Sequence, residues 1–532
     1  MQKPVLMLLS CLLICSAIPS YGSSAAAGGP EAVAKQVLDK LFEAAGQPII
    51  QQPSLKITTE NKRVAAYFPK ENTIVLDLKA YEVCQSLGKD SLQALAFIIG
   101  HELAHALQRE VRLASKATNF LSYDKNYHTS TRAEKVADIQ GVFSAYLAGY
   151  KVGQAVELIL PKLYEAYGLN GKPLLGYPPL AERQATAKEV LATTDTLIQL
   201  FETANYLIVA EQYEIAGYCL DHVLKYYQGR ELYNNRGILY LLAAMEYFLP
   251  STDRFVYPVE LDNATQLRKF EKSRGGIVLP APERLIRNGL LEKAAEQFRM
   301  AIKLDKNYWP AKLNLLCCFN LLEKPQQALD FSQKNKMPKL AANNLETGAG
   351  LELVLGISHA LLNDKAMATG HFFAAKQSRS ELLQVQAQYN LDVLNGREQI
   401  ILVGHFFDFP AEFLQLVKAI QLPRMGQVNP KPLANGNATL KMLRQGNTLI
   451  LTFGDKDGNI VSIARFENEH VPNMNLLEMS ETMDKNFFYN MVAMPKGFYL
   501  KSEDADAVVK VDENGKVLEM ARLFRHRQGS RN

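Results

Sequence analysis

The residues best suited to chemistry lie together in the segment His101-Glu102-Leu103-Ala104-His105. Residues four apart in an α-helix share one face, so His101 and His105 can bind a single metal ion. Catalytic zinc sites combine three imidazole or carboxylate ligands with a water molecule. Zinc lowers the pKa of that water and polarises a carbonyl group, and Glu102 can pass the water's proton to the leaving amine. The H-E-x-x-H spacing therefore predicts a zinc peptidase site with Glu102 as the general base.

The residues around this motif predict the helix that must carry it. Leu92, Leu95 and Ile99 recur every three to four residues, which is the period of one helical face. Asp90 can cap this helix, and Gln93 follows three residues later, as in a capping box. The same motif also arises by chance on ordinary helices. Against that alternative, two histidines and a carboxylate in such an apolar helix would be costly to bury without partners.

A third ligand is available downstream, in the segment Thr131 to Asp138. Glu134 and Asp138 are four residues apart, so they also share one helical face. Glu134 can complete a His-His-Glu ligand set. Asp138 can accept a hydrogen bond from the distal nitrogen of a ligand histidine. The ordinary alternative for both residues is a solvated surface charge, which for Asp138 would be one partner of an i,i+4 pair.

Together the two motifs resemble those of a known group of enzymes. H-E-x-x-H followed after about 30 residues by E-x-x-A-D-x-x-G is similar to gluzincin metallopeptidases of the HtpX and CAAX prenyl protease type. The residues that match the second motif are Glu134, Ala137, Asp138 and Gly141. The resemblance covers about residues 50–190. It implies an α+β zincin-type catalytic domain that binds one Zn²⁺ per chain through His101, His105 and Glu134.

Two flanking segments extend the resemblance. Val64–Phe68 followed by Thr73–Leu78 is similar to the hairpin before the family's active-site helix. Its edge strand would hold an extended substrate by main-chain hydrogen bonds. Tyr177–Arg183 is similar to the family's H-P-x-x-x-x-R segment, which implies a catalytic role for Arg183. The alternative for Arg183 is a structural salt bridge. Tyr177 stands where the family usually has histidine, so metal ligation from this position is not expected.

The first residues have the layout of a secretory signal peptide. After a positive start, Val5–Ile18 is almost wholly apolar, and small residues follow. This run is too short to span a bilayer comfortably. We expect residues 1–22 to be removed after about Gly22, which places the protein in the periplasm or outside the cell. The alternatives are a buried N-terminal helix or a lipid anchor at Cys11 or Cys15.

The composition is that of an ordinary globular protein. Its 532 residues suggest three or four domains of roughly 100–200 residues each. A net charge of +4, with no Lys/Arg-rich run, argues against a nucleic-acid partner. No stretch after the signal peptide reaches 18 uncharged apolar residues, so no transmembrane span is expected. The other four cysteines lack disulfide or zinc-binding spacing, and we expect them to be small buried hydrophobes: Cys84, Cys219, Cys317 and Cys318.

Residues 194–396 are predicted to form tetratricopeptide-like helical repeats. Small and aromatic residues recur at helix-contact spacing: Ala294, Phe298 and Ala301; Ala328 and Phe331; Ala368, Phe372 and Ala375. Ala328 follows Ala294 by 34 residues, the tetratricopeptide period. Gly356 is expected to give close helix packing, and Asn235-Arg236-Gly237 to open another helix. A Pro-, Asp- and Arg-rich segment from about 248 to 284 interrupts the array. The alternative is an irregular helical bundle.

Residues 397–532 are predicted to form a small antiparallel β or α+β module without recognisable chemistry. Strand-like runs flank Asp457-Gly458 and Asn514-Gly515, two dipeptides that supply the positive φ of tight hairpins. The expected fold class is therefore multidomain and mostly α. It combines an α+β catalytic domain over residues 30–193, an α-solenoid and this β-rich module.

The leading functional hypothesis is a secreted zinc metalloendopeptidase. A signal peptide followed by a peptidase domain and helical repeats resembles the periplasmic BepA-like branch of the family, which implies envelope protein quality control. Its partners would be polypeptide substrates, together with proteins bound by the concave surface of the repeats. One alternative is a chaperone or binding protein with a silent or autoinhibited site, which His128 and Tyr123 are placed to cover. Another is a metal hydrolase that acts on something other than peptides.

Overall fold

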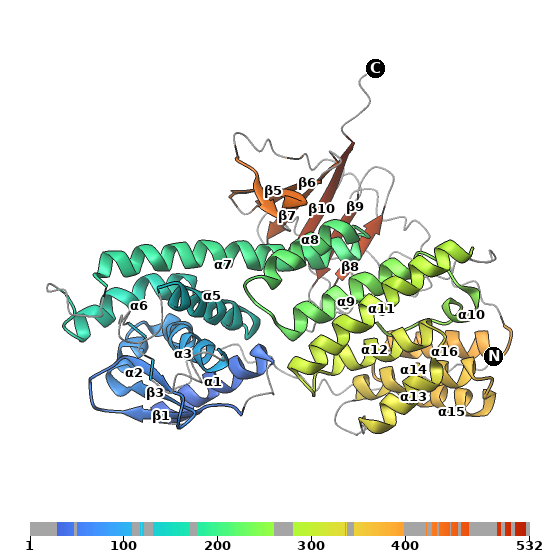
Figure 1. The fold of residues 1–532 in the computed structure, drawn as a ribbon, viewed down its shortest axis with the longest axis horizontal. Helices are drawn as coiled ribbons and strands as arrows, with labels where there is room; N and C mark the ends of the chain where they lie inside the picture. The colour runs from blue at the N-terminus through green and yellow to red at the C-terminus, as the bar shows by residue number, and fades with distance from the viewer. Residues whose placement is uncertain are drawn as a thin grey trace, which may run out of the picture.

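A computed structural model shows a mostly helical, multidomain protein with a small sheet at each end of the chain (Figure 1). Residues 1–22, which are expected to be a signal peptide, lie outside the described residues, as do Tyr123, His128 and Tyr177. The described residues are 29–46, 51–108, 117–118, 120–121, 131–170, 178–259, 280–335, 337, 345–397, 422, 428–433, 436–446, 448–455, 459–467, 497–501, 506–511 and 517–527.

The N-terminal unit packs helices against a three-stranded sheet. Its strand order is β1-β3-β2, with β1 parallel to β3 and β2 antiparallel to it. The hairpin expected before the metal-binding motif is therefore present. The elements of this unit are α1 (Pro30–Ala45), β1 (Ser54–Thr58), β2 (Ala65–Phe68), β3 (Thr73–Asp77), α2 (Leu78–Gln85), η1 (Gly88–Asp90), α3 (Ser91–Leu107), α5 (Thr131–Leu147) and α6 (Gly153–Ala166).

Helix α3 is the centre of this unit. Every residue from Ala94 to Ala106 is buried, as expected for a helix that is apolar on all sides. Its nearest helical neighbour is α5, and the two backbones approach most closely where Gly100 faces Gly141. A Cβ atom on Gly141 would lie 2.8 Å from the carbonyl carbon of Gly100. Two glycines thus let α3 and α5 cross closely enough to bring their polar residues together.

A single long helix, α7 (Leu180–Val209), links the N-terminal unit to the rest of the chain. The domain boundary expected between residues 193 and 194 falls inside this helix. The segment contains no glycine or proline that could end it. The two regions are therefore joined by a continuous helix, and the boundary between them is not a linker.

The middle of the chain is a series of antiparallel helix pairs. The second half of α7 packs on α8, α9 on α11, α12 on α13, and α14 on α15, with α16 against the last pair. The Pro-, Asp- and Arg-rich segment that was expected to interrupt the helices, from about 248 to 284, lies between α9 and the start of α11. The helices are α8 (Tyr213–Leu224), α9 (Arg230–Met245), α10 (Pro250–Asp253), α11 (Ala281–Leu304), α12 (Trp309–Leu321), α13 (Pro325–Lys334), α14 (Leu345–Leu361), α15 (Lys365–Ala375) and α16 (Glu381–Leu394).

Within these pairs, glycines face aromatic rings. A Cβ atom on Gly237 would lie 2.5 Å from the ring of Phe298, and one on Gly356 would lie 2.6 Å from the ring of Phe372. The close packing expected at Gly356 is therefore present. Helix α9 begins at Arg230, so the expectation that Asn235-Arg236-Gly237 opens a helix is wrong. These residues lie in its interior, where Gly237 makes room for the partner helix.

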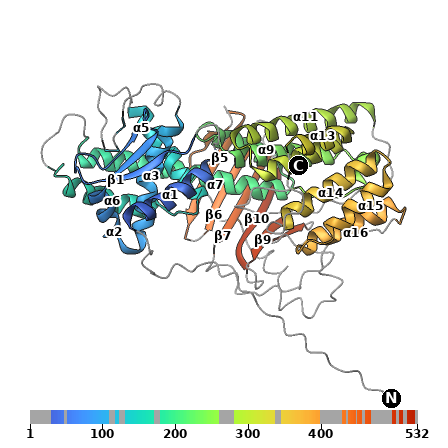
Figure 2. The same cartoon turned by 90° about the horizontal axis from the view of Figure 1, so that it is seen from below.

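The C-terminal module contains a seven-stranded antiparallel sheet with strand order β4-β5-β6-β7-β10-β9-β8. Arg465 on β7 donates to Gln199 on α7 at 2.9 Å and also pairs with Glu202, which anchors the sheet on that helix (Figures 1 and 2). The Asp457-Gly458 and Asn514-Gly515 turns lie outside the described residues. The strands are β4 (Lys431–Leu433), β5 (Ala438–Gln445), β6 (Thr448–Asp455), β7 (Asn459–Glu467), β8 (Gly497–Lys501), β9 (Asp506–Val511) and β10 (Val517–Arg527).

Two expectations from composition can be compared with the structure. In the part of the chain that the structure describes, no helix combines the length and apolarity needed to cross a membrane. The four cysteines of the helical regions are buried and carry free thiols, as predicted. Burial raises the pKa of the Cys84 thiol to about 12. The thiol therefore stays protonated, and Cys84 serves as a packing residue rather than a nucleophile.

Candidate metal centre

Three side chains converge between α3 and α5. The Nε2 atoms of His101 and His105 are 3.1 Å apart, and each lies 3.2 Å from Oε2 of Glu134. All three residues are buried. They are the one group of potential metal ligands found among the described residues. The two histidines are one turn apart on α3, while Glu134 lies near the start of α5.

The spacing of these three atoms fits a zinc ion. Two zinc bonds of about 2.05 Å that meet at a tetrahedral angle end about 3.3 Å apart. The three interatomic distances of 3.1, 3.2 and 3.2 Å come close to this value on every side of the triangle. Two imidazoles and one carboxylate are also a ligand set of known catalytic zinc sites. The residues present could therefore hold one zinc ion and leave a fourth position open.

Asp138 and Arg183 lie behind the first histidine. Asp138 Oδ1 accepts a hydrogen bond from Nδ1 of His101 at 2.8 Å, which directs Nε2 of His101 toward the triangle. Arg183 donates to both carboxylate oxygens of Asp138, at 2.9 and 3.1 Å. Asp138 is therefore not the solvated charge that was its alternative. Arg183 is buried and forms an ion pair with Asp138.

Charge and burial compete throughout this cluster. Burial disfavours the protonated form of His101, but hydrogen bonds and charges from Asp138 and Glu134 outweigh it and raise its pKa to about 10. Burial likewise disfavours ionised Glu134, yet both histidines hold the pKa of this carboxyl well below its usual range. The pKa of Asp138 is also lowered, because Arg183 and His101 outweigh its burial. Two buried carboxylates are thus held ionised beside the histidines, which suits a cation.

Glu102 does not belong to the triangle. Its Oε2 atom accepts hydrogen bonds from the Tyr67 backbone N–H at 2.9 Å and from the Thr118 hydroxyl at 2.5 Å. Its other oxygen, Oε1, is buried and has no hydrogen-bond partner among the described residues. The carboxylate is therefore anchored through one oxygen, while the other is left to accept a proton.

The edge of β2 is already occupied, contrary to the sequence-based expectation. The backbone N–H of Thr118 donates to the Tyr67 carbonyl at 3.0 Å, and that of Phe120 donates to the Ala65 carbonyl at 3.1 Å. This pairing has the antiparallel pattern of an added strand. An extended substrate cannot use these two carbonyls while Thr118 and Phe120 are bound to them.

Phe120 also covers His101, one of the three candidate metal ligands. Its ring contacts that of His101 edge-on, with centroids 5.1 Å apart, and that of Phe97 at 5.4 Å. The Arg183 guanidinium lies 5.7 Å from the same ring. No local pattern in the sequence marks Thr118, Phe120 or the Tyr67 amide as part of the site. Thr118 and Phe120 lie between the two motifs, where no periodic pattern distinguishes them.

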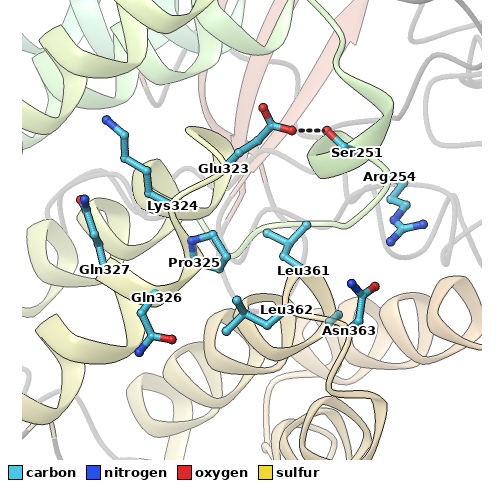
Figure 3. A pocket seen from close by; sticks show the side chains of 11 residues that line it. Ser251, Arg254, Glu323, Lys324, Pro325, Gln326, Gln327, Leu361, Leu362 and Asn363 are labelled. Atoms are coloured by element: carbon cyan, nitrogen blue, oxygen red, sulfur yellow. Dashed lines mark hydrogen bonds between the residues drawn. The ribbon is translucent and has the colours of Figure 1, made fainter.

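A separate surface pocket lies among the helices of the middle region, between α10 and α15 (Figure 3). It is lined by the turn after α12, the turn after α14 and residues around α10, and Ser251 donates to Glu323 across it at 2.9 Å. Its charged lining side chains, Arg254, Glu323 and Lys324, are exposed. The potential metal ligands of the described residues lie elsewhere, so the chemistry of this chain is best sought between α3 and α5.

Two histidines one turn apart and a carboxylate from the next helix could hold a metal ion, and a separate buried glutamate lies beside them on α3. Residues 30–159 match the model of Peptidase family M48, which supports an M48 family metallopeptidase. The matched region begins with α1 and ends within α6. It therefore contains the three ligand candidates, Glu102 and Asp138, but not Arg183. A search among curated proteins finds no match to this chain.

Proposed function

We propose that the protein is a secreted zinc-dependent metalloendopeptidase that hydrolyses peptide bonds in polypeptides. The observation that carries this proposal is the buried triangle of His101, His105 and Glu134, whose sides fit one zinc ion. Zinc bound there would polarise the scissile carbonyl and make a water molecule a competent nucleophile near neutral pH. The match to a metallopeptidase family over the same residues supports this chemistry.

Three residues of the protein would supply proton transfer and the positioning of the metal ligands. Glu102 accepts the proton from the attacking water at Oε1 and passes it to the leaving amine. Asp138 fixes the ring orientation of His101 through a 2.8 Å hydrogen bond. Arg183 holds Asp138 through two hydrogen bonds. We therefore assign Arg183 to positioning Asp138 rather than to contact with substrate, and this narrows the catalytic role implied by the family resemblance.

The regions outside the N-terminal unit support a role in binding other proteins. Stacked helix pairs with glycine–aromatic contacts are typical of tetratricopeptide-like arrays, which bind polypeptides on extended surfaces. Large apolar side chains are exposed in the last pair and the turn within it, at Leu362, Met367 and Phe373. Such side chains suit a docking surface for protein segments. Together with the signal-peptide layout, this favours the periplasmic BepA-like type and a role in envelope protein quality control.

One specific observation favours a second candidate, a binding protein or chaperone with an autoinhibited peptidase site. The edge of β2 is occupied by Thr118 and Phe120, and the metal-binding histidines are buried. In that case polypeptides would bind to the repeats without being cut. Digestion of β-casein by the zinc-loaded full chain distinguishes the two functions, since only the first predicts new peptide termini.

Zinc content tests the proposed metal centre directly. The full chain, reconstituted with zinc and dialysed, should carry about one ion, because three protein ligands are typical of a catalytic site. Glu134→Ala should lose most of it, whereas Glu157→Ala, which removes an exposed carboxylate on α6, should not. Elemental analysis that finds full zinc in Glu134→Ala would rule out this ligand set.

A further inference from the structure

The position of the Thr118 hydroxyl at the Glu102 carboxylate has a consequence for catalysis. We propose that Thr118 is a positioning residue that holds Glu102 in the orientation needed to activate water. This inference rests on the proposed function, in which Glu102 is the general base. It also assigns a role to a residue that neither metal-binding motif includes.

The hydrogen bonds at Glu102 are asymmetric. Oε2 accepts from two donors, the Thr118 hydroxyl at 2.5 Å and the Tyr67 backbone N–H at 2.9 Å. The same Tyr67 N–H also approaches the Thr118 Oγ1 atom at 2.7 Å, so the three groups form one compact cluster. Oε1 is buried without a hydrogen-bond partner among the described residues. Both anchoring donors thus act on one oxygen, and the other is the only one left for a water molecule.

The backbone around Thr118 is itself fixed. Its N–H donates to the Tyr67 carbonyl at 3.0 Å, and the Phe120 N–H donates to the Ala65 carbonyl at 3.1 Å. The Phe120 ring packs against Phe97 and His101, with only 2 % of the residue exposed. The hydroxyl is therefore presented by a residue that is paired along the sheet and anchored in the core.

A fixed carboxylate matters because the last torsion of a glutamate side chain is broad and costs little energy to change. A hydrogen bond to an ionised group is short and strong, so two of them at Oε2 restrict where Oε1 can point. Catalysis depends on such orientation, and small misplacements of a reacting group lower the rate severely. Thr118 should therefore affect the chemical step, and it has no direct contact with the ligand triangle.

The test compares Thr118→Val with Thr118→Ser in the zinc-loaded full chain. Valine keeps the shape and main-chain pairing but lacks the hydroxyl, while serine restores it. The probes are β-casein and an internally quenched peptide copied from one of its mapped cleavage sites. Thr118→Val should lower kcat by about 10–100-fold with KM and zinc content unchanged, and Thr118→Ser should recover most of the loss. Thr194→Val is the matched control, since this buried hydroxyl donates to the Val190 carbonyl of its own helix, its one hydrogen bond among the described residues.

A spectroscopic measurement keeps the inference testable without activity. The infrared band that Glu102→Gln removes reports the Glu102 carboxylate. That band should shift in Thr118→Val and stay in place in Thr118→Ser. An unshifted band, an unchanged kcat in Thr118→Val, or equal losses in the valine and serine variants would overturn the positioning role. A rise in kcat/KM in Thr118→Val would also overturn it, because the residue would then be blocking the substrate edge. If the zinc-loaded wild type cleaves neither probe, the proposed function fails, and the infrared band alone decides the role of Thr118.

Discussion

Two buried arginine–aspartate pairs in different regions illustrate how one interaction can serve two purposes. Beside the candidate metal centre, Arg183 binds both oxygens of Asp138, whose carboxylate also accepts a hydrogen bond from His101. In the middle helical region, Arg287 binds Asp253 and donates to the carbonyls of Tyr247 and Leu321 at 3.0 and 2.8 Å. Both arginines are at most 1 % exposed. The two pairs differ in what else they contact.

The additional contacts determine the role of each pair. Burial acts to raise the pKa of both carboxyl groups. At Asp138 the effects of Arg183 and His101 are larger than that of burial, and the pKa is lowered. At Asp253 burial outweighs the effect of Arg287, and the pKa is raised. Asp138 therefore presents an ionised acceptor to His101, one of the three proposed metal ligands. The Arg287 pair instead ties together the ends of neighbouring helices, and its expected contribution is structural.

The largest effect is expected from breaking the structural pair. Arg287→Met takes the paired cation from buried Asp253, which keeps hydrogen bonds from the Leu249 N–H and the Thr252 hydroxyl. It also takes the Arg287 donors from the Tyr247 and Leu321 carbonyls, and the free energy of unfolding should fall by about 3–5 kcal/mol. Urea titration followed by circular dichroism measures this loss. Arg284→Met is the control on the same helix, because its pair with Glu323 is exposed and should contribute only about 0–1 kcal/mol. Loss of zinc from folded Arg287→Met would show that the two regions are not independent.

A smaller effect is expected at two of the close helix contacts. Gly141→Ala would place a Cβ atom 2.8 Å from the backbone of Gly100, and Gly237→Ala would place one 2.5 Å from the Phe298 ring. Each should destabilise the protein by about 1–3 kcal/mol through overpacking. Only Gly141→Ala should also weaken zinc binding, because α3 and α5 carry the ligands. Equal zinc affinities of the two variants would contradict this, and Gly289→Ala, which meets no atom within 4 Å, is the control.

The smallest effect is expected from substitutions that remove only the negative charge of each aspartate. Asp138→Asn keeps an acceptor oxygen for His101 but loses the negative charge, and zinc affinity should fall about 10–100-fold. Asp253→Asn makes the same chemical change in the repeat region and should leave zinc affinity unchanged. Competition with a chromogenic chelator measures both values. Equal affinities in the two variants would mean that Asp138 serves only the packing of Arg183.

The helix that carries His101 and His105 could be predicted from sequence because it depends on short-range spacing. The two histidines lie one turn apart on any helix, and the apolar period around them predicts that helix. Glu134 lies 29 residues from His105, so its place in the triangle was predictable through the resemblance of the two motifs to a known family and not through local spacing. The family match over residues 30–159 supports the class of chemistry predicted for these residues.

The remaining features depend on contacts between distant parts of the chain. Thr118 meets Tyr67 across 51 residues, and Arg465 meets Gln199 across 266. No local period encodes such contacts. A change in residue pattern predicts a domain boundary after residue 193. Helix α7 continues through this position because helix propensity is uninterrupted there. The occupied edge of β2 likewise follows from tertiary packing alone.

Hydrolysis of β-casein by zinc-loaded Glu102→Gln is the most direct test of the proposed chemistry. Glutamine keeps the size of the side chain and an acceptor oxygen but cannot take a proton at neutral pH. Because Glu102 lies outside the ligand triangle, the variant should still carry about one zinc ion per chain. Its rate should fall at least about 100-fold below that of the wild type. Near-normal hydrolysis that a chelator abolishes would show that another residue activates the water, and loss of zinc would show that Glu102 is a ligand.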